Sequence, residues 1–140
     1  GWSARLHEIG LAVSHSQYHK HGAYLVEHSD MPGFSRQEQQ LLATLILGQR
    51  NKFPLVVFAD LEAERAKAAK RLCVLLRLAT LLNRSRSRQP LPKLSINAKG
   101  DTVQIKFPTR GWLNQHPLTQ ADLAQEIKYL KAAKIRLSIV

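Results

Sequence analysis

Apolar residues recur at the three- and four-residue spacing of amphipathic α-helices over the first 83 positions of the chain. Short polar breaks separate these runs, and one of them, Asp30-Met31-Pro32-Gly33, contains the proline and glycine that are typical of a turn. The pattern predicts four helical segments, which are the end of a helix at 2–12 and helices over about 15–28, 35–47 and 60–83.

Local signals indicate where the predicted helices begin and which faces they bury. Ser35 and Glu38 have the spacing of a capping box, and Asp60 is suited to cap the last of the four helices. Phe53-Pro54 interrupts the helical pattern before that point. We expect three buried faces, formed by Tyr18, Ala23, Leu25 and Val26, by Leu41, Leu42, Leu45 and Ile46, and by Leu72, Leu75, Leu76, Ala79 and Leu82.

The periodicity changes after residues 84–92, a basic and proline-containing stretch that we interpret as a linker. Apolar and polar residues then alternate over 94–98 and again over 102–107. Lys99-Gly100-Asp101 lies between the two runs, so this part of the chain predicts a β-hairpin.

A helix and a strand are predicted after the hairpin. Thr119 and Asp122 have capping spacing and would open a helix that runs to about Ala133, and residues 135–140 alternate again. The last 50 residues therefore have a ββαβ order. The sequence predicts an α+β fold with two parts, a mainly helical domain at 1–89 and a small α+β domain at 90–140.

Histidines are concentrated near the start of the chain. His7 is followed by Glu8 in an apolar segment, and His15, His19 and His21 come soon afterwards. A lone histidine on an amphipathic helix is usually an ordinary surface or core residue, and a metal site needs fixed ligand geometry with supporting partners. Because the eighteen residues after Glu8 contain no acid, spacing alone does not define a ligand set.

Several segments together resemble one enzyme family. They are Leu6-His7-Glu8-Ile9-Gly10-Leu11, His15-Ser16-Gln17-Tyr18-His19-Lys20-His21-Gly22, Ser29-Asp30-Met31-Pro32-Gly33-Phe34, Glu38-Gln39-Gln40-Leu41-Leu42-Ala43-Thr44 and Leu75-Leu76-Arg77-Leu78-Ala79-Thr80-Leu81-Leu82-Asn83. Over residues 2–88 the chain is similar to the C-terminal region of the exopolyphosphatase / guanosine pentaphosphate phosphohydrolase (Ppx/GppA) family. Residues 91–140 are in keeping with that region.

The resemblance implies that the chain is part of a larger hydrolase acting on phosphoric anhydrides. In that family two N-terminal actin-like ATPase-type domains use Mg2+ to cleave terminal phosphates from polyphosphate or guanosine pentaphosphate. This chain has no Gly-rich phosphate loop and no carboxylate set for Mg2+. We therefore expect no catalytic residue and no cofactor within it, Mg2+ in the absent domains, and a homodimer.

The His7–Glu8 pair also resembles the start of the metal site in HD-type domains, so the helical domain at 1–89 can be compared with that superfamily residue by residue. Glu8 stands in place of the Asp that gives that superfamily its name, and Thr80 stands where a second Asp is expected. A hydroxyl group is a poor replacement for an anionic ligand of a hard cation. The resemblance therefore implies that His7 and Glu8 are vestigial and that no metal is bound.

The net charge of the chain indicates which class of partner it binds. Lys and Arg outnumber Asp and Glu by 21 to 10, which gives +11, and ten basic residues but no acid lie from Arg65 to Lys99. Such a field attracts polyanions. Charge alone slightly favours nucleic acid, the commoner partner of basic domains. The resemblance instead implies that the chain binds polyphosphate or guanosine pentaphosphate and guides it toward the catalytic domains.

Candidate phosphate-binding residues follow from side-chain chemistry and from the resemblance. Arginine donates paired hydrogen bonds to phosphate, and lysine acts as a point charge. Arg50 and Lys52 fall where the family has a basic pair. The other candidates are His15, His19, Lys20 and His21, and the linker residues Arg84, Arg86 and Arg88. An ordinary solvated charge is the alternative for each of them. A further group, Lys67, Lys70, Arg71 and Arg77, is expected to face the absent domains or a second subunit.

Two other functions stay open from the sequence. A stand-alone metal phosphohydrolase would need a rebuilt site around His7, Glu8 and His19. A nucleic-acid-binding module would need aromatic residues placed among the basic ones, but the tryptophans and tyrosines are scattered. The lone Cys73, which we expect to be buried, and the lack of an apolar run near 18 residues favour a cytoplasmic location, with peripheral membrane association as an alternative.

Overall fold

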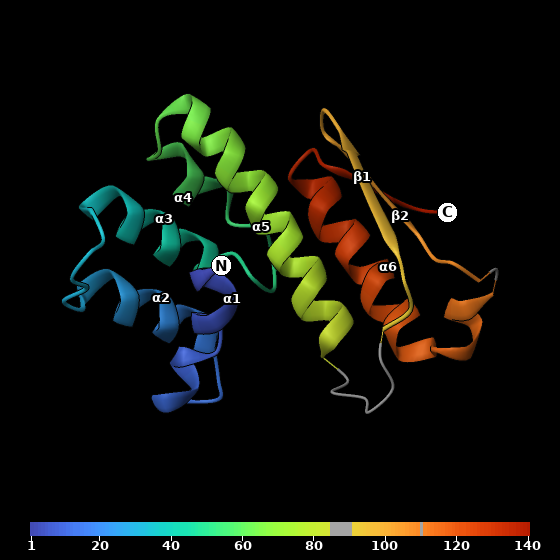
Figure 1. Cartoon of the computed structure of the whole chain (residues 1–140), viewed down its shortest axis with the longest axis horizontal. Helices are drawn as coiled ribbons and strands as arrows, with labels where there is room; N and C mark the ends of the chain where they lie inside the picture. Colours follow the sequence, from blue (N-terminus) through green and yellow to red (C-terminus); the bar gives the residue numbers. More distant parts are fainter. Residues whose placement is uncertain (85–90, 110) are drawn as a thin grey trace. The chain divides into compact units, whose positions relative to one another are not determined.

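The structure, a computed structural model, describes residues 1–84, 91–109 and 111–140. Two compact units make up the chain, residues 1–78 and 79–140 (Figure 1). The predicted α+β class is confirmed, since most elements are helices and a small sheet follows them. The domain boundary predicted between residues 89 and 90 falls outside the described residues and stays a prediction.

The first unit is helical. Its elements are α1 (Trp2–Leu6), the 3₁₀ helix η1 (Ile9–Ala12), α2 (Tyr18–His28), α3 (Arg36–Leu47), α4 (Leu55–Ala59) and most of α5 (Ala63–Asn83). The expected helical end at 2–12 is thus divided into two short pieces. α2 begins at Tyr18 rather than at His15, because Gln17 has a left-handed φ of 52° that is incompatible with a continuing helix.

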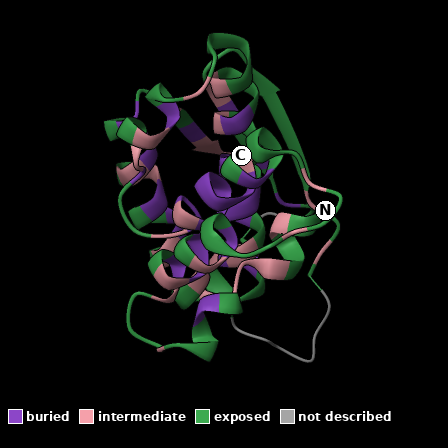
Figure 2. Cartoon of the chain, turned by 90° about the vertical axis from the view of Figure 1, so that its left-hand side faces the viewer, coloured by how far each residue is buried: buried purple, intermediate pink, exposed green. Residues whose placement is uncertain are grey.

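Packing of α2 against α3 forms the core of this unit. Ala23, Val26, Leu42, Ala43 and Ile46 are buried there, and Leu6, Met31, Phe34 and Leu47 pack around them. The inward and outward sides of the helices differ clearly in burial (Figure 2). The capping box predicted at the start of α3 is confirmed, with Glu38 N donating to Ser35 Oγ at 3.2 Å and Ser35 N donating to Glu38 Oε2 at 2.8 Å.

The helix predicted over 60–83 begins later than expected. A short helix, α4, follows Pro54, and the sequence does not predict it because Phe53-Pro54 indicates only a break in the helical pattern. Asp60 lies at the C-cap of α4, so the prediction that it caps the next helix is wrong. α5 begins at Ala63.

The buried side of α5 also differs from the predicted one. Leu76 and Leu82 are buried as expected. Three residues expected inward are exposed, namely Leu72, Leu75 and Ala79. Arg77, which the sequence places toward the absent domains or a second subunit, is only 2% exposed. The buried side is therefore rotated relative to the predicted one, and it includes Cys73 as expected.

The second unit contains a three-stranded sheet and one long helix. Its elements, after the last turn of α5, are β1 (Ser95–Lys99), β2 (Thr102–Lys106), the 3₁₀ helix η2 (Trp112–Gln115), α6 (Pro117–Ala132) and β3 (Arg136–Ile139). β2 is the central strand, antiparallel to β1 and parallel to β3. The predicted ββαβ order is confirmed, and α6 provides the crossover that a parallel pair requires.

α6 begins three residues before the predicted start, because its N-cap is His116 rather than Thr119. Pro117 is its first residue, with His116 as the N-cap, and proline is well suited to that position because its missing N–H is not needed there. Val103, Ile105 and Leu137 of the sheet are buried, and so are Leu123 and Leu130 of α6. Among the helices of the described residues, none is long and apolar enough to span a bilayer.

Candidate functional site

Tyr18, the first residue of α2, lies at the centre of the predicted phosphate-binding residues. Cζ of Arg50 lies over its ring, 4.8 Å from the centroid. The ring centroids of His15 and His19 are 6.3 Å and 6.4 Å from that of Tyr18. We call His15, Tyr18, His19 and Arg50 the Tyr18 cluster. It joins two of the predicted groups, which are more than thirty residues apart in the sequence, and Tyr18 itself was not predicted as part of the site.

The loop that carries Arg50 is held on two sides. From α5, Arg77 donates hydrogen bonds to the backbone oxygens of Gly48 and Asn51, each at 2.6 Å. Asn51 has a left-handed φ of 61°, so the chain turns sharply directly after Arg50. On the other side, Gln49 Nε2 donates to the backbone oxygen of His7. The loop is therefore attached both to α5 and to the segment of the His7–Glu8 pair.

Arg77 was expected to face the absent domains or a second subunit, but it is buried and supports the loop of Arg50 instead. It is buried, its guanidinium bonds are charge-assisted, and such bonds contribute about 1.5–3 kcal/mol each. A signal for this role is present in the sequence. Arg77 lies four residues after Cys73 and four before Leu81, both of which are buried, so helical spacing places it on the buried side.

Positive charge surrounds His19. The side chain is only 5% exposed, and its pKa is lowered from 6.5 to about 4. Burial is the largest cause, followed by the charge of Arg50 and then by smaller contributions from Lys20, His21 and Arg77. His19 is therefore neutral at pH 7, and every charge that shifts its pKa is positive. Such a local field favours an anion.

Two buried polar atoms of the Tyr18 cluster lack a partner. Neither Nδ1 of His19 nor Nε of Arg50 makes a hydrogen bond to any residue that the structure describes. Most buried polar atoms in proteins are paired, so such exceptions need an explanation. Arg50 is only partly buried. Its side chain is therefore accessible in part, while its buried Nε is a donor without an acceptor among the described residues.

The remaining predicted residues differ in their surroundings. Lys20 and Lys52 are exposed, and His21 is partly buried. Arg84 belongs to the second unit and forms an ion pair with Asp122, with Nη1 3.4 Å from Oδ1. Arg86 and Arg88 lie outside the described residues.

The segment of the His7–Glu8 pair borders this site through Gln49. Nδ1 of His7 lies 2.8 Å from the backbone oxygen of Ala4. Within residues 1–84, 91–109 and 111–140, no three His, Cys, Asp or Glu side chains are grouped as a metal ion would require.

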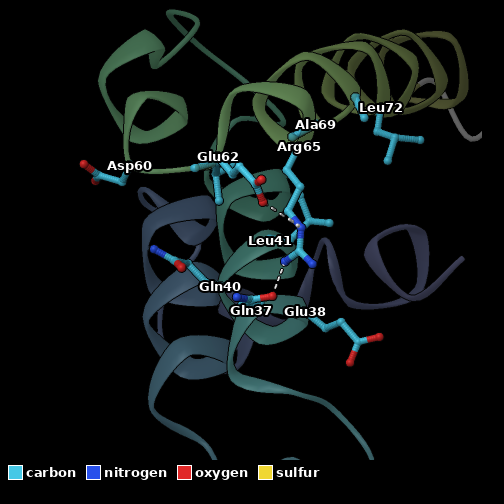
Figure 3. Close-up of a pocket in the computed structure, with 11 residues that line it drawn as sticks. Gln37, Glu38, Gln40, Leu41, Asp60, Glu62, Arg65, Ala69 and Leu72 are labelled. Atoms are coloured by element: carbon cyan, nitrogen blue, oxygen red, sulfur yellow. Dashed lines mark hydrogen bonds and ion pairs between the residues drawn. The ribbon is translucent and has the colours of Figure 1, made fainter.

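A separate hollow of about 240 Å³ lies beside α3 and α5 in the first unit (Figure 3). Arg65 reaches across it, bonded to Gln37 and paired with Glu62 at 3.9 Å. Three carboxylates line it, those of Glu38, Asp60 and Glu62. This hollow is less suited to a polyanion than the Tyr18 cluster, because its carboxylates repel negative charge.

The family resemblance drawn from the motifs agrees with a comparison of the whole chain. The family model described as Ppx/GppA phosphatase, domain III, matches residues 1–127. The match includes the Tyr18 cluster, Arg77 and the sheet residues of β1 and β2. The chain therefore belongs to the Ppx/GppA phosphatase family.

Proposed function

We propose that this chain binds polyphosphate, or guanosine pentaphosphate, at the Tyr18 cluster and guides it toward N-terminal catalytic domains that the chain does not contain. The observation that supports this most directly is the positive field at the cluster, where Arg50 is held over Tyr18 and all charges acting on His19 are basic. In this proposal Mg2+ and the hydrolytic step belong to the absent domains, and the whole protein is a homodimer.

Arg50 is the residue best placed to bind phosphate. Its contact with the Tyr18 ring restricts the side chain, so less rotamer freedom is lost when the guanidinium binds an oxyanion. Its loop is fixed by Arg77, which prevents the binding group from moving away. Lys52, two residues further on and exposed, adds a point charge next to it.

His19 acts in this proposal through its surroundings rather than by direct contact. The side chain is too deeply buried to meet a ligand in this conformation, and its neutral form places no charge in the core. Lys20 and His21 follow it in α2, and the charge of Lys20 adds to the field that attracts the anion. His15, exposed beside Tyr18, is the histidine best placed for contact.

Nucleic acid is the less favoured partner, because two aromatic rings on which bases could stack are already in contact with other side chains. Arg50 covers the Tyr18 ring. In the second unit Trp112 is stacked against both Phe107 and His116, with centroids 5.0 Å and 3.7 Å away. Binding of single strands relies on aromatic rings on which bases can stack.

Substitution of Arg50 tests the binding site. Loss of a charge-assisted bond of about 1.5–3 kcal/mol predicts that Arg50→Met weakens tripolyphosphate binding by roughly ten- to a hundredfold. Arg71→Met is the matched control, because it removes the same group from an exposed position on α5. Equal affinities of the Arg50→Met variant and the wild type, measured by calorimetry, would remove the site from the account.

Chain-length dependence tests the guiding role. Charge reversal at both Arg50 and Lys52 is expected to weaken binding of long polyphosphate more than binding of tripolyphosphate, because a guided chain meets more of the surface. The same loss at every length would mean that the two residues form a local anion site without a guiding function.

A further inference from the structure

The two faces of the sheet in the second unit have different chemistry. One face buries apolar residues, among them Val103, Ile105 and Leu137. Strand register places eight other residues on the opposite face, and we call them the basic sheet face: Ser95, Asn97 and Lys99 of β1, Thr102, Gln104 and Lys106 of β2, and Arg136 and Ser138 of β3. All eight are polar, six are exposed and two are partly buried. This face is therefore open and wholly polar.

Charge on the basic sheet face is of one sign. It contains three cations and no acid, in a unit where residues 79–140 include eleven Lys and Arg against three Asp and Glu. None of the three cations forms an ion pair with a described residue. Of the acids, Asp122 pairs with Arg84 and Glu126 is buried, which leaves Asp101 in the hairpin turn as the nearest exposed carboxylate.

The cations surround a row of hydrogen-bonding groups. Lys99 and Arg136 flank Thr102 in the register, so they are two strand spacings apart, or about 10 Å. Lys106 lies four residues along β2 from Thr102, or about 13 Å. Between these ends one row crosses all three strands, formed by Asn97, Gln104 and Ser138. Amides and hydroxyls donate hydrogen bonds to phosphate oxygens, and the flanking cations neutralise their charge.

We propose that the basic sheet face is a second binding surface for inorganic polyphosphate, separate from the Tyr18 cluster; the choice of this polyanion rests on the function proposed above. A phosphate chain presents only acceptors and negative charge, and the face presents cations with amide and hydroxyl donors. No aromatic residue is among the eight, so the face offers bases nothing to stack on and nucleic acid is disfavoured.

Neutralisation of the three cations tests the surface. The variant Lys99→Gln, Lys106→Gln, Arg136→Gln is compared with Lys128→Gln, Lys131→Gln, Lys134→Gln, which removes the same charge from exposed positions on and directly after α6. We expect the sheet variant to bind long polyphosphate at least tenfold more weakly than the control variant. Loss of three phosphate contacts also makes log K fall less steeply with log salt, with a slope smaller in magnitude by about 2.

The outcomes separate this surface from the Tyr18 cluster. Tripolyphosphate binding followed by the NMR signal of His19 reports on the cluster, and we expect the sheet variant to keep it. If the sheet variant binds long chains as the wild type does, the basic sheet face is not a binding surface, whatever Arg50→Met does. If only the sheet variant loses affinity, this surface stands and the Tyr18 cluster does not.

Two further results would overturn the proposal. Equal losses in the sheet variant and the α6 control would show general attraction to a basic unit rather than a defined surface. An equal loss of affinity for single-stranded RNA of matched charge would show that the face binds nucleic acid as readily as polyphosphate.

Discussion

His19 gives the sharpest test of the electrostatics at the site. Its pKa is lowered from 6.5 to about 4, first by burial and then by the charge of Arg50. In the unfolded chain the imidazole takes up a proton as the pH falls through 6.5, but in the folded protein it stays neutral until about pH 4. The unfolded state therefore binds more protons in this window, and stability is lost as the pH falls through it.

The size of the effect follows from the two pKa values. Loss of the whole contribution of His19 to the free energy of unfolding corresponds to about 3 kcal/mol. Between pH 7.5 and pH 4.5 the expected decrease in the free energy of unfolding is about 2.5 kcal/mol. Other titrating groups contribute to the same change. The His19→Gln variant lacks the imidazole but keeps those other groups, so the difference between the wild type and the variant isolates the contribution of His19.

Urea unfolding at several pH values and NMR titration of the imidazole measure this directly. We expect His19→Gln to lose less stability than the wild type over the window, and we expect the His19 signal to titrate near pH 4, well below the ordinary imidazole pKa of 6.5. A His19 pKa near 6.5, or the same pH dependence in both proteins, would refute the reasoning. Bound tripolyphosphate should raise the pKa, because it offsets the positive field while burial persists.

Three further predictions concern the framework of the site. Gly10→Ala should destabilise the first unit by about 3 kcal/mol or more in urea unfolding, because the new Cβ would lie 1.7 Å from the backbone oxygen of Tyr18. The control Gly1→Ala should have no effect, because a Cβ there meets nothing within 4 Å. Arg77→Met should lower the free energy of unfolding by about 2–4 kcal/mol, since two backbone oxygens lose charge-assisted bonds, and a change under about 0.5 kcal/mol would contradict that role. Ser35→Ala should cost about 1 kcal/mol through loss of the N-cap bond, with an unchanged melting temperature as the contrary result.

Local chemistry made much of the fold predictable. The capping box of Ser35 and Glu38 depends on residues three apart, and the hairpin depends on alternation around Gly100, so both are written into short segments. The start of α2 was not predictable in this way, because a glutamine at position 17 does not by its residue type indicate the left-handed φ that Gln17 adopts. Gly10, whose backbone packs against Tyr18, shows how closely η1 and α2 approach there.

The candidate site was predictable only as far as it depends on residue type rather than on tertiary structure. Arg50 and the histidines were identified from the family resemblance and from their charge. Tyr18, which organises them, is an ordinary amphipathic position in the sequence, and only the tertiary structure places Arg50 over its ring. Arg77 was expected to face the absent domains or a second subunit, although its helical spacing from Cys73 indicates the buried side.

The measurement that tests the central claim most directly is calorimetric binding of long-chain polyphosphate and of single-stranded RNA of equal charge, each across a salt series. We expect polyphosphate to bind more tightly at every salt concentration, and we expect this preference to fall in Arg50→Met but not in Arg71→Met. Equal affinities with equal salt slopes would contradict the account, because they would reduce the interaction to general attraction between a basic protein and any polyanion.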